Sequence, residues 1–129
     1  MKISNIVTSV QMSDEYSPVR IKNIFDNLDG GFYIFIDVED IKCESTKLFV
    51  KIYDNLGSEL ICLDFKMGNV ARKDTIICYI NYKSLENLPL SSFGKWRLLV
   101  MDDKEETVAK YSFVVRNIAF TYTSRGVPQ

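Results

Sequence analysis

The chain has 129 residues, of which 47% are hydrophobic and 26% are charged. This length fits one domain of about 100–150 residues, with no room for a second core, and the composition excludes a disordered chain. Sixteen Lys and Arg against 17 Asp and Glu give a net charge of −1. This balance argues against nucleic acid as the main partner, because phosphate binding depends on clustered cations. The densest basic spots are Arg72-Lys73 and Lys95 with Arg97, and acidic residues lie near both.

The N-terminal residues lack the pattern of a signal peptide. Residues 1–10 contain one basic residue, and Ser, Asn and Thr interrupt their apolar residues. No segment approaches the ~20 apolar residues that a membrane helix requires. These observations predict a cytoplasmic protein with no membrane insertion.

The first part of the chain is typical of strands separated by turns. Residues 2–11 alternate loosely and are rich in Val, Ile and Thr, which predicts a first strand. Residues 19–25 fit either a short strand or a loop with one helical turn. Gly30 and Gly31 indicate a turn, because glycine accepts positive φ. The apolar run 32–38 predicts a central strand covered on both faces.

A hairpin and a further strand are expected next. Residues 47–53 and 58–65 alternate in hydrophobicity on either side of the turn Asp54-Asn55-Leu56-Gly57. Residues 75–82 predict another strand. Residues 84–94 indicate a crossing loop with a helical turn near its start.

The last predicted hairpin has the cleanest alternation of the chain. Its strands are residues 95–101 and 107–115, on either side of an acidic turn at 102–106. Trp96, Leu98 and Val100 share one face of its first strand. The residues that share a face of its second strand are Ala109, Tyr111, Phe113 and Val115.

Together these elements predict an all-β fold, an antiparallel two-sheet sandwich of seven or eight strands. No long amphipathic helix interrupts them, and a parallel sheet would need helical crossovers. We expect a single β-sandwich domain in residues 1–116 and a C-terminal extension or tail in residues 117–129.

Two segments resemble bacterial immunoglobulin-like domains. The stretch Gly94-Lys95-Trp96, its alternating apolar residues, the acidic turn Asp102-Asp103 and then Phe113-Val114-Val115 are similar to the last hairpin of many such domains. Residues 49–57 are similar to their middle hairpin. The resemblance covers about half the chain and implies an immunoglobulin-like fold, not a function. Antibody-type domains place a Trp between two Cys, whereas the only Trp here follows all three Cys.

Little in the sequence points to catalysis. The absence of histidine excludes Ser-His-Asp and Cys-His sites and zinc sites with imidazole ligands. Cys43, Cys62 and Cys78 are widely spaced and form no CxxC pair, so we expect free thiols that pack as small hydrophobic residues. The sequence therefore predicts no enzymatic activity, no metal and no cofactor.

Carboxylates gather at three places, at 37–40, at Asp54 and at 102–106. Two such loops meeting at one end of a sandwich would ligate Ca²⁺ through oxygen, as in C2-type domains. A calcium-dependent C2-like module is therefore one alternative. The other interpretation is that acidic residues fill exposed turns and keep the protein soluble.

The first functional hypothesis is a non-catalytic protein-interaction or structural module, such as an accessory subunit or a component of a bacterial or phage assembly. Its ligand would be a protein partner or a second copy of the chain. The predicted contact residues lie in the last strand and the tail, and they are Phe113, Val115, Phe120 and Tyr122. Phe120 and Tyr122 fit a final strand of their own domain equally well.

The second hypothesis is a small-ligand or carbohydrate binder that uses a concave sheet face with exposed tyrosines. The candidate tyrosines are Tyr33, Tyr53, Tyr79, Tyr82 and Tyr111.

Overall fold

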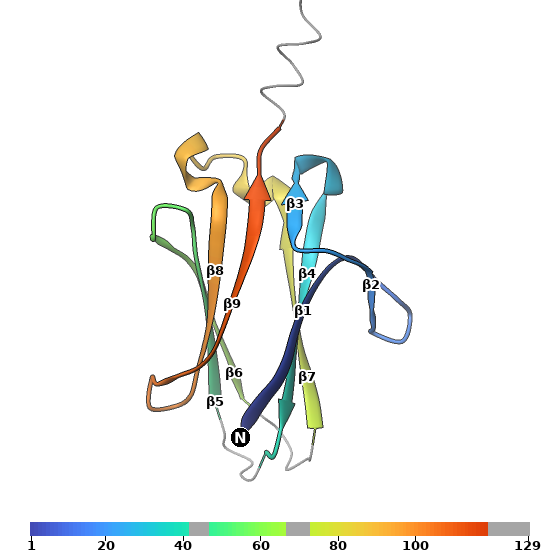
Figure 1. Cartoon of the computed structure of the whole chain (residues 1–129), viewed down its shortest axis with the longest axis vertical. Coiled ribbons are helices and arrows are strands. Elements are labelled where there is room, and N and C mark those ends of the chain that lie inside the picture. The colour runs from blue at the N-terminus through green and yellow to red at the C-terminus, as the bar shows by residue number, and fades with distance from the viewer. Residues whose placement is uncertain (42–46, 67–72, 119–129) are drawn as a thin grey trace, which may run out of the picture.

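The computed structural model describes residues 1–41, 47–66 and 73–118, which form two facing β-sheets (Figure 1). One sheet has the strand order β2-β1-β4-β7 and the other β3-β9-β8-β5-β6. The strands are β1 (Lys2–Met12), β2 (Pro18–Ile21), β3 (Ile24–Asp26), β4 (Gly31–Glu39), β5 (Lys47–Tyr53), β6 (Glu59–Lys66), β7 (Lys73–Asn81), β8 (Gly94–Met101) and β9 (Thr107–Arg116).

The all-β class and the two-layer arrangement predicted from the sequence are confirmed. The helical elements in the described part are three short 3₁₀ turns, and none of them is long and apolar enough to cross a membrane. They are η1 (Asn27–Asp29), η2 (Tyr82–Leu85) and η3 (Leu90–Ser92). The last two lie in the connection 82–94, where a crossing loop with a helical turn was expected.

The strand count and one strand pairing differ from the prediction. The described residues form nine strands rather than seven or eight, because residues 18–26 supply two short strands. β2 pairs antiparallel with β1, whereas β3 crosses to the other sheet and pairs parallel with β9. Phe25 explains this crossing, since its side chain is fully buried and stacks on Phe32 with ring centroids 4.5 Å apart. The expectation of a wholly antiparallel sandwich is therefore wrong at this position.

The core lies between the sheets and follows the alternation read from the sequence. On β8, Trp96, Leu98 and Val100 are completely buried, while the neighbouring Lys95 and Arg97 are exposed. Each buried side chain of this size stabilises the fold by about 1.5–3 kcal/mol. The other completely buried hydrophobic residues are Phe25, Phe32, Ile34, Ile36, Val38, Leu48, Val50, Ile52 and Val115.

Strand β4 is covered on both faces at its centre, as its apolar run predicted. Ile34 and Ile36 point into the core, and Phe35 points to the opposite face but is only 3% exposed. In the sheet, Phe35 lies between Val7 of β1 and Ile77 of β7. The outer face of the four-stranded sheet is therefore partly apolar.

The indole of Trp96 ties three segments together at one end of the sandwich. Its Nε1 donates a hydrogen bond to the carbonyl oxygen of Ser92 over 2.8 Å, and the same oxygen accepts the backbone N–H of Asn55 at 3.1 Å. The turn after β5, the η3 turn and the start of β8 are thereby held in one place. This end of the sandwich borders the candidate site described below.

Candidate functional site

The structure corrects the predicted contact surface at two of its four residues. Phe113 and Val115 are 2% and 0% exposed, because they occupy the inward positions of β9 and pack in the core. Their side chains are not on the surface that a partner of the folded domain would meet. Phe120 and Tyr122 lie outside the described residues.

The five candidate tyrosines do not form one surface. Tyr33 and Tyr79 come together on the outer face of the four-stranded sheet, with ring centroids 4.6 Å apart. Tyr53 lies on the opposite sheet, with its side chain outward. Tyr82 is buried and donates its hydroxyl hydrogen bond to the carbonyl of Arg116, and burial raises its pKa. Tyr111 lies between β9 and β1, where its hydroxyl pairs with that of Thr8.

The acidic turns use carboxylates to hold the backbone. Asp54 Oδ1 accepts the N–H groups of Leu56 and Ser58, and Asp102 Oδ1 does the same for Lys104 and Glu106, each at 2.9 Å. The two turns lie at opposite ends of the sandwich (Figure 1). Within residues 1–41, 47–66 and 73–118, no three His, Cys, Asp or Glu side chains are grouped to hold a metal ion.

The described thiols are both free. Cys78 is buried in the core, as its strand position predicted, and burial raises its pKa to about 11. Cys62 is exposed on β6, so the expectation that it packs as a small hydrophobic residue is wrong. It alternates with Ile61 and therefore faces outward on an edge strand. Cys43 lies outside the described residues.

The outward side of the five-stranded sheet carries an excess of positive charge. We call the outward-facing side chains of β5, β6, β8 and β9 the basic sheet face. Seven of the chain's 16 Lys and Arg lie there, against two of its 17 Asp and Glu, which are Glu59 and Asp64. The basic members are Lys47, Lys51, Lys66, Lys95, Arg97, Lys110 and Arg116.

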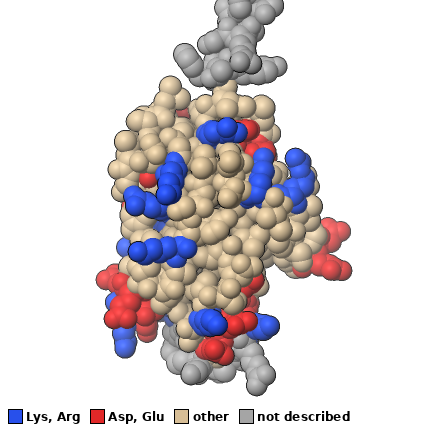
Figure 2. All heavy atoms as spheres, viewed as in Figure 1, with Lys and Arg blue, Asp and Glu red and all other residues tan. Residues whose placement is uncertain are grey.

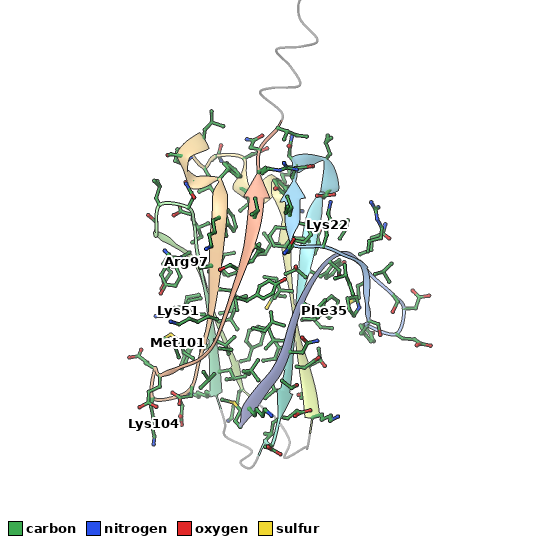
Figure 3. All side chains as sticks on the ribbon, viewed as in Figure 1. Lys22, Phe35, Lys51, Arg97, Met101 and Lys104 are labelled. Atoms are coloured by element: carbon green, nitrogen blue, oxygen red, sulfur yellow. The ribbon has the colours of Figure 1, made fainter. Side chains whose placement is uncertain are left out.

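The sandwich separates this face from the partly apolar outer face of the four-stranded sheet. Figure 3 shows Lys51 and Arg97 on one side of the molecule and Phe35 on the other. In the view of Figure 2, acidic side chains gather at the lower left and at the right, and several basic side chains lie along the left side.

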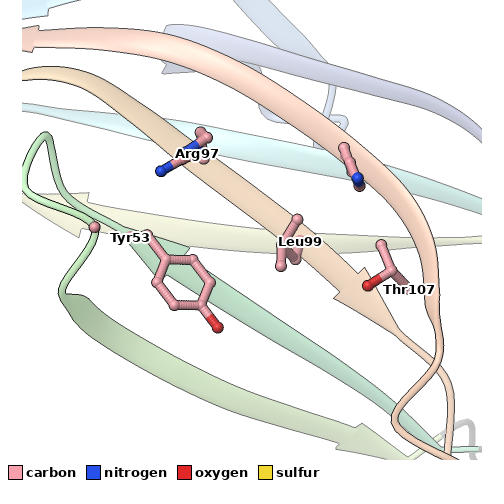
Figure 4. Close-up of a pocket in the computed structure, with 6 residues that line it drawn as sticks. Tyr53, Arg97, Leu99 and Thr107 are labelled. Carbon is pink, nitrogen blue, oxygen red and sulfur yellow. The ribbon is translucent and has the colours of Figure 1, made fainter.

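A shallow hollow of about 390 Å³ lies on the basic sheet face (Figure 4). Half-buried Leu99 lies at its centre, in register between Lys51 of β5 and Lys110 of β9. Arg97, two residues earlier on β8, is in register with Tyr53. The lining residues are Tyr53, Gly57, Arg97, Leu99, Thr107 and Lys110.

The cations around the hollow are available to a ligand. Within the described part of the chain, neither Arg97 nor Lys110 forms an ion pair. Lys51 Nζ lies 3.6 Å from a carboxylate oxygen of Glu59, which raises the pKa of Lys51. An exposed pair of this kind is weak and screened by salt, so Lys51 can exchange Glu59 for another carboxylate. The hollow therefore suits a ligand with negative groups on either side of an apolar one.

The sequence indicates one part of this face but not the rest. Lys95 and Arg97 stand out as a basic spot, but Lys51 lies 46 residues before Arg97 and Lys110 lies 13 residues after it. A usable signal exists in the hairpins themselves. In each of these strands, Lys or Arg occupies positions that alternate with the core residues, which predicts that they share the outward side once the strands pair.

No family model matches the chain, and no curated protein matches it in sequence. Among solved structures, the chain is similar to the crystal structure of an endonuclease/exonuclease/phosphatase from Beutenbergia cavernae DSM 12333, at 9% sequence identity and a TM-score of 0.39. The match covers 66% of this chain and 20% of that protein. A likeness this weak carries no information about activity.

Proposed function

We propose that the chain is a non-catalytic binding module that holds an acidic segment of a partner protein on its basic sheet face. The observation that carries this proposal is the hollow over Leu99, bordered by the cations Arg97, Lys110 and Lys51. An apolar side chain of the segment would lie on Leu99, and carboxylates on either side of it would meet the cations. Arg97 suits a carboxylate especially well, because the planar guanidinium binds one through two parallel hydrogen bonds.

The residues that line the hollow support binding rather than chemistry. They include no carboxylate and no thiol, and the chain has no histidine, so the groups that most often act as general base or as thiol nucleophile do not line the hollow. Its sides come from β5, the turn after β5, β8 and β9, and β8 pairs with both β5 and β9. A rigid sheet presents these side chains at fixed spacing, which lowers the entropic cost of binding.

The distribution of charge favours a short protein segment over a nucleic acid. The acidic turn 102–106 follows directly after β8, and Asp64 lies opposite Phe49 at the other flank of the face. A polynucleotide carries a phosphate at every residue and would bring phosphates against these carboxylates. A short segment with few carboxylates fits between them.

We also propose that the sandwich is immunoglobulin-like. The pairings β1–β4 and β4–β7 in one sheet, with β5–β8 and β8–β9 in the other, support this proposal, because they follow the order in which such domains pair their strands. The parallel pairing of β3 with β9 would then be a variation at one edge. This proposal concerns the fold and gives no function by itself.

The binding proposal is tested with a synthetic peptide of alternating Glu and Leu and the full-length chain. We expect binding in fluorescence anisotropy that weakens as salt is raised, because exposed charge pairs are screened. The double variant Arg97→Glu/Lys110→Glu should bind about tenfold more weakly, which corresponds to two lost charge contacts at ~0.7 kcal/mol each.

The matched control is Lys2→Glu/Lys83→Glu, which changes the net charge by the same amount at exposed positions away from the basic sheet face. It should bind the peptide nearly as well as the unchanged chain. Equal weakening of both double variants would show that only net charge matters. Tighter binding of a single-stranded oligothymidylate than of the peptide, or no peptide binding at low salt, would also refute the proposal.

A further inference from the structure

The outer face of the four-stranded sheet carries a pair of tyrosines unlike anything on the basic sheet face. Tyr33 of β4 and Tyr79 of β7 lie directly opposite each other in the strand register. Their ring centroids are 4.6 Å apart, and the ring planes are inclined by 43°. Tyr79 is 52% exposed, so much of its ring faces solvent. We call these two side chains the tyrosine pair.

Gly31 lets Tyr79 lie along the sheet. A Cβ atom built at Gly31 would collide with the phenol oxygen of Tyr79 and would come within 2.7 Å of its Cζ atom. The ring therefore extends over Gly31 and presents a broad side to solvent. A larger residue at position 31 would displace the ring from this orientation.

The β1–β2 hairpin forms a wall beside the tyrosine pair, where it projects from the sandwich (Figure 1). A hollow of about 620 Å³ lies between them. Its lining residues include Gln11, Ser13, Asp14 and Val19 in addition to the tyrosines. The hairpin turn is fixed by the bonds from Ser13 N to Ser17 O at 2.9 Å and from Ser17 N to Ser13 Oγ at 3.1 Å.

We infer that this hollow is a binding site for a neutral carbohydrate. A sugar ring has one side of C–H groups and an edge of hydroxyl groups, and the hollow provides a partner for each. The exposed ring of Tyr79 offers an apolar surface for the C–H side. Gln11, Asp14 and the two phenol hydroxyls offer donors and acceptors for the edge.

The charge of the lining decides between classes of sugar. Asp14 is the only charged residue among the lining residues, so an anionic sugar would meet a like charge with no cation to offset it. The volume lies within the range of about 300–1,000 Å³ that is usual for small-ligand pockets. The site is open, so we expect millimolar affinity for one or two sugar rings. It lies on the sheet opposite the basic sheet face, and the two proposals can fail independently.

The test is a titration of the ¹⁵N-labelled full-length chain with cellobiose, maltose and lactose, followed by amide chemical shifts. We expect shifts that saturate in the millimolar range at residues 9–14, 31–35 and 77–81, for at least one of the three disaccharides. Tyr79→Ala should abolish these shifts, while Tyr79→Phe should retain most of the affinity because it keeps the ring.

The control variant is Tyr53→Ala, which removes a tyrosine from the opposite sheet and should leave sugar binding unchanged. An amide spectrum of Tyr79→Ala that differs only near position 79 would show that the variant is folded. The inference is overturned if none of the three sugars shifts these amides, or if the shifts persist in Tyr79→Ala. It is also overturned if a polyproline peptide shifts these amides while the sugars do not, since aromatic grooves also bind such peptides.

Discussion

Replacing Trp96 by phenylalanine tests how the buried indole holds one end of the sandwich. The change removes the hydrogen bond from Nε1 to the carbonyl oxygen of Ser92, which is worth about 1 kcal/mol. That oxygen keeps the N–H of Asn55 as a donor, so it is not left without a partner. The smaller ring also weakens the edge contact with Phe113, where the ring centroids are 6.2 Å apart, and leaves a void. Together these losses predict a destabilisation of about 2–3 kcal/mol.

Urea unfolding followed by far-ultraviolet circular dichroism measures this loss. Trp96 is the only tryptophan, so the variant has no indole fluorescence to follow. Trp96→Ala should cost more, about 4–5 kcal/mol, because the whole site is emptied. Tyr79→Phe, which trims an exposed aromatic side chain, should stay within about 0.5 kcal/mol of the unchanged chain. A loss below about 1 kcal/mol for Trp96→Phe would refute the role given to the indole.

Three further changes probe other parts of the fold. Burial raises the pKa of Cys78 from 9.0 to about 11, so the thiol stays neutral in the folded state at a pH where it ionises in the unfolded chain. The contribution of this thiol to the free energy of unfolding is therefore complete below pH 9 and is lost as the pH rises towards 11. Cys78→Ala should therefore flatten the alkaline fall in stability by about 2–3 kcal/mol, and an unchanged pH profile from chemical denaturation would contradict this. Tyr82→Phe removes the hydrogen bond to the Arg116 carbonyl and should cost about 1–1.5 kcal/mol in urea unfolding, with a neutral result arguing that water replaces the bond. Gly31→Ala places a Cβ 2.7 Å from the Ile80 carbonyl oxygen and should lower stability by about 1–3 kcal/mol, while a variant as stable as the unchanged chain would show that the sheet adjusts easily.

The strands were predictable because burial on one side of a sheet imposes a period of two. Trp96, Leu98 and Val100 alternate with Lys95, Arg97 and Leu99 in the sequence, and they are fully buried in the structure. The positions of β2 and β3 were not predictable in the same way. Three or four residues are too few to show a period, and the pairing of Phe25 with Val115 joins residues that are far apart in the chain.

The candidate site was less predictable than the fold, because strand order decides which outward residues become neighbours. Lys51, Leu99 and Lys110 form one row across three strands, and sequence alone does not give that order. The same limit applies to the contact residues predicted on β9. Phe113 and Val115 follow the alternation that marks core positions, and in the structure that burial removes them from the surface.

The course of β1 and β9 has a mechanical consequence. Met1 lies at one end of the long axis of the sandwich, and β9 leaves at the opposite end (Figure 1). Tension applied between these two points would run along the strands, at right angles to the backbone hydrogen bonds that join β1 to β4 and β9 to β8. Such a pull loads many bonds together instead of opening them in succession, so the domain is built to resist stretching along this direction.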